Sequence, residues 1–368
     1  MTTAVIPSLT QANAVLPDEY RSFDDAEVIE RIEHVKRVRG PELTILGHHY
    51  QDKRIVRLSD HIGDSFGLSE AAAREQAARY IVFCGVHFMA ESAKILCRDD
   101  QVVLHPDLSA GCPMADMADI DQVEWAWDDL MASAPGRTVI PVTYMNSDAE
   151  LKAFCGRNDG IVCTSSNAGA VFDWAYERGD AVLFFPDEHL GWNTGRKWGL
   201  TSDETALWDP RYEMGGVVLK ELGDARLILW KGYCHVHTRF KVAHLEQARL
   251  DDPAVKIIVH PECTADVVDS ADGCGSTGFI CKYVDDAPKG ASIAIGTEIN
   301  LIDRLADEYR DKRIVPLTRS LCPNMYKVSL NDLLWTLEEL GEVNVVAMPE
   351  DIKTHARLAL GRMLGVSA

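Results

Sequence analysis

The chain has 368 residues, of which 46% are hydrophobic and 26% are charged, and its formal net charge is −20. This composition is typical of a folded globular protein with two or three domains, and it excludes collagen-like, disordered and disulfide-scaffold proteins. The acidic excess argues against binding nucleic acid or an anionic membrane, because both interactions need clustered Lys and Arg.

The beginning of the chain lacks the pattern of a secretory signal. Residues 1–20 have no basic start followed by an apolar core, and the longest apolar run, 80–90, is too short to span a membrane. We therefore expect a cytoplasmic protein in which residues 1–40 form an extension and a helix. Its ten cysteines should stay reduced, and none has Cys-x-x-Cys spacing, so a metal site must take ligands from distant parts of the chain.

Short β-branched apolar runs alternate with helical patterns, which predicts α/β structure with parallel sheets and crossover helices. Strands are expected at 43–46, 81–84, 101–104, 138–142, 160–164, 181–185, 226–230, 255–259, 292–295 and 313–317. Helices are expected between them, for example at 69–79 and 298–309. Ligands of doubly wound sheets bind beyond the carboxyl ends of the strands, so the residues that follow these runs are the candidates for chemistry.

The residues that follow the strands fall into three similar sets, which indicates three repeated α/β units. Each set has a polar motif after a strand, then a loop with a Ser or Thr, then a further motif, then a cysteine. The members are His48, Ser65, Gly85-Val86-His87 and Cys112; Tyr144, Ser165, Asp187-Glu188-His189 and Cys234; and His260, Thr277, Gly296-Thr297-Glu298 and Cys322. The spacing is nearly equal in the first and third sets, and the longer second set carries its extra residues at 192–222.

The repeat predicts the division of the chain into domains. The first domain is expected at 41–134, with the C-terminal residues 326–368 packing back on it. The second is expected at 135–238 with an insertion at 192–222, and the third at 239–325.

The repeat alone leaves two interpretations of its cysteines open. A free cysteine is more often a small buried hydrophobic residue than a ligand, and Cys84 and Cys163, inside apolar strands, are expected to be core. Cys112, Cys234 and Cys322 follow strands in loops, which makes them candidate metal ligands at one shared centre.

Nine short segments, taken in order, resemble those of quinolinate synthase, the iron–sulfur enzyme that makes the pyridine ring of NAD. They are GHHYQ at 47–51, FCGVHFMAE at 83–91, TYMN at 143–146, TSSN at 164–167, PDEHLG at 186–191, GYCHVH at 232–237, HPEC at 260–263, GST at 275–277 and CPNM at 322–325. Each segment alone is a weak signal, and the specificity of the resemblance comes from their number and order.

The resemblance implies three similar three-layer α/β domains, arranged with pseudo-threefold symmetry around one [4Fe-4S] cluster per chain. It assigns the cluster to Cys112, Cys234 and Cys322, which leaves one iron free to act as a Lewis acid. The implied reaction condenses iminosuccinate with dihydroxyacetone phosphate to quinolinate, with loss of phosphate and two waters. Aspartate oxidase, which supplies iminosuccinate, is an implied functional partner.

The resemblance also implies roles for individual residues. The catalytic residues are Glu262, as general acid and base, together with Tyr50, Tyr144 and His237. The substrate-binding residues are His48, Ser65, Tyr144, Met145, Asn146, Ser165, His260, Pro261, Glu262, Ser276 and Thr277. Cys263, directly after Glu262, is an alternative thiol near the same site.

Three other functions stay open from the sequence. His235 and His237 form a His-x-His pair that suits zinc in a hydrolase. A cluster enzyme of the diphthamide-synthesis type would bind S-adenosylmethionine, although the Tyr-Met-Asn and His-Pro-Glu motifs speak against it. A non-enzymatic iron–sulfur sensor is disfavoured by the acidic charge and by the lack of a basic DNA-binding helix.

Overall fold

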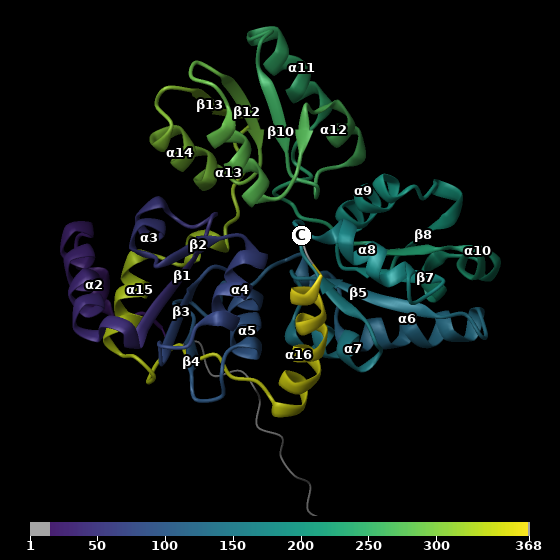
Figure 1. Ribbon diagram of the computed structural model, residues 1–368, viewed down its shortest axis with the longest axis horizontal. Helices are drawn as coiled ribbons and strands as arrows, with labels where there is room; N and C mark the ends of the chain where they lie inside the picture. Colours follow the sequence, from purple (N-terminus) through teal and green to yellow (C-terminus); the bar gives the residue numbers. More distant parts are fainter. Residues whose placement is uncertain (1–14, 367–368) are drawn as a thin grey trace, which may run out of the picture.

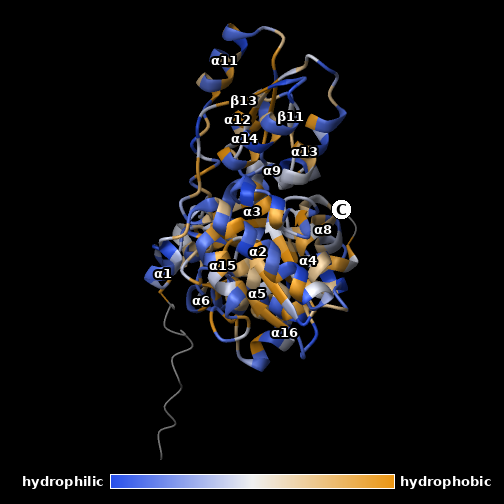
Figure 2. Ribbon diagram, turned by 90° about the vertical axis from the view of Figure 1, so that its left-hand side faces the viewer, coloured by the Kyte–Doolittle hydropathy of each residue, from blue (hydrophilic) through white to orange (hydrophobic). Residues whose placement is uncertain are grey.

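The computed structural model describes residues 15–366 and contains three separate parallel sheets with helices around them. The sheets lie in three lobes around a common centre (Figure 1). This arrangement confirms the predicted α/β class with three similar units. Viewed from the side, hydrophilic residues cover the outside of the lobes, and hydrophobic residues lie along the strands and the inner helix surfaces (Figure 2).

The first unit is a four-stranded sheet with helices on both faces. Its strands are β1 Leu43–His48, β2 His61–Gly63, β3 Tyr80–Cys84 and β4 Val102–Leu104. Its helices are α1 Asp18–Arg21, α2 Asp25–Arg39, α3 Lys53–Leu58, α4 Ser65–Arg74, α5 His87–Leu96 and α15 Leu330–Glu338. Strand side chains alternate between the faces: Val82 packs in the cluster that contains α2, α3 and α15 residues, whereas Ile81 and Phe83 pack with α4 and α5.

The second unit has five strands, and the third has four. The second contains β5 Val139–Tyr144, β6 Ile161–Cys163, β7 Ala181–Phe185, β8 Thr205–Trp208 and β9 Leu227–Trp230, with α6 Ile120–Ser133, α7 Ala149–Arg157, α8 Ala168–Tyr176, α9 Glu188–Trp198 and α10 Leu219–Asp224. The third contains β10 Lys256–Val259, β11 Gly273–Cys274, β12 Ser292–Gly296 and β13 Arg313–Pro316, with α11 Val242–Asp251, α12 Ala265–Ser270, α13 Thr277–Asp286 and α14 Ile299–Glu308.

The three sheets share one strand order. They run β2-β1-β3-β4, β6-β5-β7-β9-β8 and β11-β10-β12-β13, with all pairs parallel. In each sheet the chain moves from the first strand to one side and then crosses to the other. This reversal opens a crevice at the carboxyl ends of the first and third strands (β1 and β3, β5 and β7, β10 and β12), and the motifs after β1, β5 and β10 begin there.

The insertion at 192–222 supplies the fifth strand of the second sheet. It contains the second half of α9, then β8, and then the start of α10. Strand β8 pairs with β9 at the outer edge of the sheet. The insertion therefore lengthens the sheet away from its crevice and leaves the common strand order intact.

The predicted strands are all present, and the structure adds three that the sequence did not indicate. The added strands are β2, β8 and β11, each of four residues or fewer. The helix expected at 69–79 is wrong at both ends, because α4 begins at Ser65 and ends at Arg74. The Asp64 side chain caps it by accepting from the Gly67 N–H at 2.9 Å.

The C-terminal segment divides between two units. Helix α15 packs against α2 of the first unit, as expected for residues 326–368. The last helix, α16 Glu350–Gly365, differs from the expectation, since it packs mainly against α7 and β6 of the second unit and only partly against α5. Within residues 15–366, no helix combines the length and apolar character that a membrane crossing requires.

Candidate active site

The carboxyl ends of the three sheets enclose a small central cavity with a volume of about 70 Å³. Its walls include these predicted site residues from all three units: His48, Tyr50, Ser65, Cys112, Tyr144, Asn146, Ser165, Cys234, His237, His260, Glu262, Thr277 and Cys322. Apolar side chains complete the wall, among them Val86, Phe88, Met89, Val236 and Met325. Motifs far apart in the sequence thus meet in one enclosed space.

The side-chain alternation of extended backbone selects which motif residues face the cavity. The first and third residues of each motif line it: His48 and Tyr50, Tyr144 and Asn146, His260 and Glu262. The middle residues do not line it: His49, Met145 and Pro261. Met145 is instead buried with its sulfur 3.2 Å from the Ser92 hydroxyl. Ser276 also lies outside the central cavity, since it lines a neighbouring one together with Pro261.

The three cavity cysteines are held by the same backbone contact. In each unit, the first residue of the helix after the third strand donates its N–H to the carbonyl two positions before the cysteine. These bonds run from His87 to Ala110 at 2.8 Å, from Glu188 to Gly232 at 2.8 Å, and from Ile299 to Ser320 at 2.9 Å. Each cysteine carbonyl then accepts an N–H three or four residues later, so every thiol stands at the start of a tight turn.

These thiols form a donor set that suits a thiolate-bound iron–sulfur cluster. Burial raises the pKa of Cys112 to about 12, and it also raises the pKa of Cys234 and Cys322. Backbone N–H groups aimed at the sulfurs oppose that rise: those of Ala115 and Met114 at Cys112, His237 at Cys234, and Met325 and Asn324 at Cys322. Such N–H groups favour the thiolate, and a bound cationic metal would favour it further.

Glu262 is the centre of a buried hydrogen-bond network. It is only 2% exposed, and its Oε2 lies 2.9 Å from His237 Nδ1 while its Oε1 accepts from the Tyr144 hydroxyl at 2.5 Å. Burial raises the pKa of Glu262, but the electrostatic influence of the His237 and His260 rings and the two hydrogen bonds outweigh it and lower the pKa to about 2. Glu262 is therefore a carboxylate at neutral pH, and it accepts hydrogen bonds from His237 and Tyr144.

The network continues from His237 toward the first unit. The Tyr50 hydroxyl lies 3.4 Å from His237 Nε2 and 2.5 Å from Thr297 Oγ1. Thr297 Oγ1 is also 3.3 Å from His237 Nε2, so the three groups form a triangle. Burial raises the pKa of Tyr50 and of Tyr144 well above the usual range, which keeps both phenols protonated.

His48 and His260 occupy matching positions and share a tautomer. The Tyr50 N–H donates to His48 Nδ1 at 3.1 Å, and the Glu262 N–H lies 3.4 Å from His260 Nδ1. With Nδ1 accepting, Nε2 carries the proton of the neutral ring. Burial lowers the pKa of His260 to about 3 and that of His48 well below its usual range, so both present an uncharged N–H donor.

Hydroxyl groups at helix starts give the cavity its capacity for anions. Ser65 and Thr277 are the first residues of α4 and α13, where unpaired backbone N–H groups concentrate. Asn146 adds a buried amide oxygen that has no hydrogen-bond partner within residues 15–366, which can accept from an N–H or O–H group of a substrate. A substrate with carboxylate or phosphate groups would find donors on opposite walls.

Comparison with known proteins identifies the family. The family model described as quinolinate synthetase A protein matches residues 30–365. A quinolinate synthase of Corynebacterium glutamicum is 48% identical over 98% of this chain and 93% of its own length. The quinolinate synthases of Rhodopirellula baltica and Acidobacterium capsulatum are 48% and 46% identical, over 94% and 98% of this chain and 93% and 99% of their own lengths.

The chain belongs to the quinolinate synthase family. It is therefore an enzyme of NAD biosynthesis.

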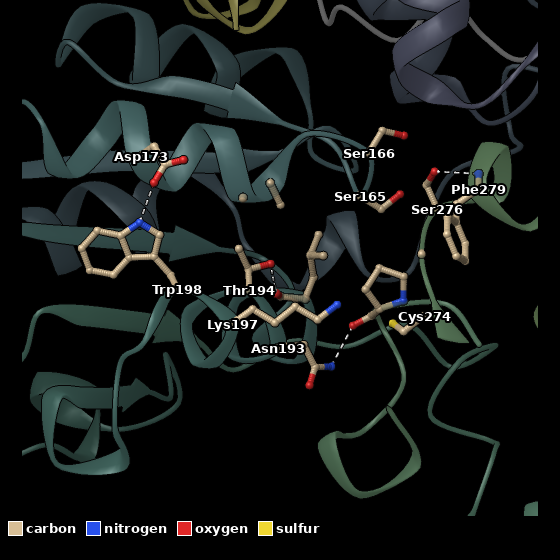
Figure 3. A pocket seen from close by; sticks show the side chains of 15 residues that line it. Ser165, Ser166, Asp173, Asn193, Thr194, Lys197, Trp198, Cys274, Ser276 and Phe279 are labelled. Carbon is tan, nitrogen blue, oxygen red and sulfur yellow. Dashed lines mark hydrogen bonds between the residues drawn. The ribbon is translucent and has the colours of Figure 1, made fainter. Parts of the chain in front are cut away.

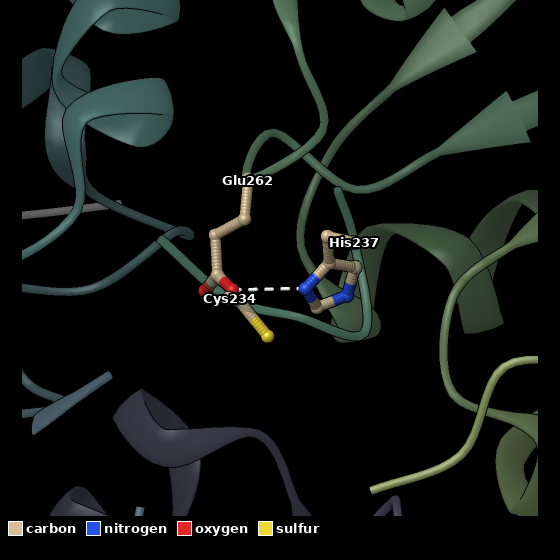
Figure 4. A group of neighbouring side chains, drawn as sticks. All are labelled: Cys234, His237 and Glu262. Atoms are coloured by element: carbon tan, nitrogen blue, oxygen red, sulfur yellow. Dashed lines mark hydrogen bonds and ion pairs between the residues drawn. The ribbon is translucent and has the colours of Figure 1, made fainter. Parts of the chain in front are cut away.

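Within this quinolinate synthase fold, one cluster of side chains also has the geometry of a single-ion site. Cys234 Sγ, a His237 nitrogen and a Glu262 oxygen all lie within 4.8 Å of one another (Figure 4). His235, the other half of the predicted zinc pair, does not line the central cavity, and neither does Cys263. A divalent cation would thus use a different set from the His-x-His pair.

Three polar residues of the quinolinate synthase cavity region were missed by the sequence interpretation of the site. Thr297 is fully buried and holds Tyr50 and His237, while Asp64 and Thr164 line the cavity. A signal existed for Thr297, because Gly296-Thr297-Glu298 is the third-strand motif of the repeat. Asp64 likewise stands in a motif of the repeat, the loop Gly63-Asp64-Ser65, and its carboxylate accepts from the Ser166 hydroxyl at 2.6 Å and so joins the first unit to the second.

Proposed function

We propose that this enzyme condenses iminosuccinate with dihydroxyacetone phosphate to give quinolinate, phosphate and two waters. The observation that carries the proposal is the meeting of three thiols from three units with the Glu262 network in one cavity. The proposed reaction balances in atoms and electrons without an external oxidant or reductant. The residues therefore need to supply binding, orientation and proton transfer.

The proposed cofactor is one [4Fe-4S] cluster per chain, with Cys112, Cys234 and Cys322 as its protein ligands. Their equivalent turns and the backbone N–H groups at their sulfurs support this assignment. When bound, such a cluster supplies an iron without a protein ligand, which acts as a Lewis acid toward a substrate oxygen.

The proton-transfer roles follow from the protonation states of the cavity residues. Glu262, ionised at neutral pH, accepts a proton from a carbon or nitrogen acid of the substrate, and its hydrogen bond from Tyr144 orients it. His237, between Glu262 and Tyr50, carries protons between the two walls. Tyr50 donates to a ketone or departing oxygen, and Thr297 fixes its hydroxyl.

The binding roles in this proposal fall to the residues that surround the network. His48 and His260 donate from Nε2 without adding charge, and Asn146 and Ser165 contribute from the second unit. Ser65 and Thr277, at helix starts, hold carboxylate or phosphate oxygens. Met145, Pro261 and Ser276 shape the surroundings of the cavity.

The remaining proposals concern organisation and context. The three sheets support domain boundaries near 41–134, 135–238 and 239–325, with 1–40 as an extension. Reduced thiols and an oxygen-sensitive cluster suit the cytoplasm. Because the imine substrate hydrolyses readily, a functional link to an aspartate oxidase that produces it accords with the reaction.

Metal analysis under anaerobic conditions tests the proposal. We expect about four iron and four sulfide per chain, as a [4Fe-4S] cluster requires, and formation of quinolinate from the two substrates. Alanine at Cys112, Cys234 or Cys322 should remove the cluster and the activity, whereas Cys281→Ala, on α13 outside the central cavity, should retain both. Zinc without sulfide would instead identify the Cys234–His237–Glu262 group as the metal site and overturn the proposed chemistry.

A further inference from the structure

The middle residues of the three cavity motifs, which do not line the cavity, share a contact of another kind. Each lies within two residues of the end of its unit's first strand, and each contacts a buried polar side chain from a different unit. The middle residues are His49, Met145 and Pro261, and the side chains that reach them are Arg304, Ser92 and Asn193, in the same order.

The three reaching side chains occupy the same place in the repeat. The helix after the third strand begins at His87 in the first unit, at Glu188 in the second and at Ile299 in the third. Each reaching side chain belongs to the sixth residue of its helix, and the exposed fractions are 0% for Ser92, 1% for Asn193 and 8% for Arg304. Buried helix positions are ordinarily apolar, so a polar residue here in all three units needs a polar partner, and that partner lies in another unit.

The contacts run around the molecule in one direction, from each of the three lobes in Figure 1 to the next. They join Ser92 of the first unit to the Met145 sulfur of the second at 3.2 Å, Asn193 of the second to the Pro261 carbonyl of the third at 2.9 Å, and Arg304 Nη2 of the third to His49 Nδ1 of the first at 3.0 Å. The last contact returns to the first unit, so the three form a closed ring.

The contact on the third unit bears directly on Glu262. Asn193 Nδ2 donates to the carbonyl of Pro261 at 2.9 Å and to that of Cys263 at 2.8 Å, and these residues stand on either side of Glu262 (Figure 3). The amide is held in this orientation because its Oδ1 accepts from Arg196 Nη2 at 3.0 Å. One side chain therefore fixes the peptide groups both before and after the proposed base.

The contact on the first unit bears on Tyr50 in a similar way. Burial and the charge of Arg304 lower the pKa of His49 to about 4, so its ring is neutral and Nδ1 can accept a hydrogen bond. Glu308 pairs with Arg304 Nη1 at 3.1 Å and holds the guanidinium in place. On the same helix, Asn300 Nδ2 donates to the Tyr50 carbonyl at 3.0 Å. Helix α14 thus fixes the backbone that carries the Tyr50 phenol.

Extended backbone points successive side chains to opposite faces, so the middle residue of a motif points away from its two neighbours. A contact that holds the middle residue therefore also holds the direction of the two residues that face the cavity. We infer that the sixth residues of α5, α9 and α14 are positioning residues, each for the cavity motif of the next unit around the ring. The inference rests on the proposed function for the roles of Glu262 and Tyr50.

Asn193→Ala tests the inference in the cluster-loaded enzyme. The variant loses both donors to the backbone around Glu262, and kcat should fall by about 10- to 100-fold at wild-type iron content, since a misplacement of about 1 Å can cost that much. Because Asn193 acts through Glu262, the same substitution in the Glu262→Gln background should lower kcat no further. The matched control is Asn158→Ala, whose amide donates to the Phe154 carbonyl at the same 2.9 Å but outside the cavity, and kcat should be unchanged.

Arg304→Met provides a second measurement in case loss of the Asn193 amide lowers the yield of folded protein. This variant loses the contact with His49, and its effect on kcat should be present in the wild-type background and absent in Tyr50→Phe. An equal fall of kcat with and without the Glu262 carboxylate or the Tyr50 hydroxyl would overturn the positioning role, and so would an unchanged kcat in the single variants.

Hydrogen–deuterium exchange separates this inference from the proposed function, because it does not depend on turnover. The backbone amides of residues 260–264 should lose protection in Asn193→Ala and keep it in Asn158→Ala. Unchanged protection in Asn193→Ala would show that Asn193 does not hold the Glu262 segment. A wild-type enzyme that forms no quinolinate would instead defeat the proposed function, and the exchange measurement would still decide whether Asn193 fixes this backbone.

Discussion

Glu262 shows how the surroundings of one residue decide its chemistry. A buried carboxylate alone would take up a proton, because desolvation disfavours its charge. Here the imidazoles of His237 and His260 and the Tyr144 hydroxyl reverse that preference and lower its pKa to about 2. The residue stays charged in an enclosed cavity, where a charge acts more strongly on a substrate than it would in water.

Replacing Glu262 by Gln should separate catalysis from cofactor binding. The amide retains hydrogen-bonding capacity toward Tyr144 and His237 but cannot accept a proton at neutral pH. We expect kcat to fall by about 10²- to 10⁴-fold, the contribution of a general acid–base group, while iron and sulfide content stay at the wild-type level. Near-normal turnover in Glu262→Gln would contradict the assigned role, and loss of iron would show that the carboxylate supports the cluster site.

His105 provides a test of pH-dependent stability outside the catalytic network. Its ring is fully buried with Nε2 3.2 Å from the Gly85 carbonyl, and burial together with the charge of His87 lowers its pKa from 6.5 to about 4. The unfolded chain binds a proton below pH 6.5, whereas the folded chain does so only near pH 4. Stability is therefore unaffected by His105 above pH 6.5 and falls as the pH drops through this window.

The full loss attributable to His105 is about 3 kcal/mol by pH 4. Its removal in His105→Gln should flatten the decline of the free energy of unfolding between pH 7 and 4, as measured by urea titration at each pH. The matched control is His34→Gln, at an exposed position on α2. If the free energy of unfolding fell equally with pH in His105→Gln and in the wild type, the pKa of His105 would not be lowered in the folded protein.

At the residue scale, the sequence motifs predicted most of the residues that line the site. Side chains of extended backbone alternate in direction, so Tyr144 and Asn146 line the cavity and Met145 does not. The prediction took the whole motif as substrate-binding and therefore included Met145 as well. Thr297 escaped notice because its role is to hold other side chains. Such contacts join residues from different units, which the sequence order does not reveal.

Among the elements, α16 packs unusually closely against α7. A Cβ added at Gly156 of α7 would come within 1.9 Å of the His355 carbonyl oxygen on α16, a backbone atom that cannot rotate away. The two helices are therefore in direct backbone contact at this point. This packing explains why the C-terminal helix lies on the second unit.

Gly156→Ala should force α7 and α16 apart and destabilise the protein. We expect a loss of about 1–3 kcal/mol, the usual cost of overpacking, seen as a lower midpoint in thermal and urea unfolding. Gly361 offers the matched control on α16, because a Cβ there meets nothing within 4 Å and the position is exposed. Gly361→Ala should stabilise by up to about 1 kcal/mol through higher helix propensity. Equal midpoints for the two variants would rule out the close contact.

The long apolar strands and their helices were predictable because burial on both faces of a parallel sheet demands continuous β-branched runs. The edge strands β2 and β11 are not, since each is only two or three residues long and is defined by pairing with its neighbour. Strand β8 lay inside a segment rich in polar residues and Gly, which indicated an insertion but not its structure. Such short edge strands form only where the folded chain brings them beside a longer strand.

For the whole molecule, the repeat provides both the scaffold and the site. Each unit directs the carboxyl ends of its strands to the centre, and each places one cysteine, one pair of alternating polar residues and one Ser or Thr hydroxyl there. Sequence spacing predicted that equivalence, but it contained no information on how the units face one another. The larger neighbouring cavity, lined by Ser165 of the second unit and Ser276 of the third, also lies between two units, so no single segment of the sequence indicated it (Figure 3).

The distribution of the three cysteines has a consequence for how the protein is made. Cys112, Cys234 and Cys322 come from the first, second and third units, and the last of them lies near the end of the chain. With the proposed ligand set, a growing chain on the ribosome offers at most two thiols until its third sheet has emerged. A cluster held by all three thiols can therefore form only after the third unit has been synthesised.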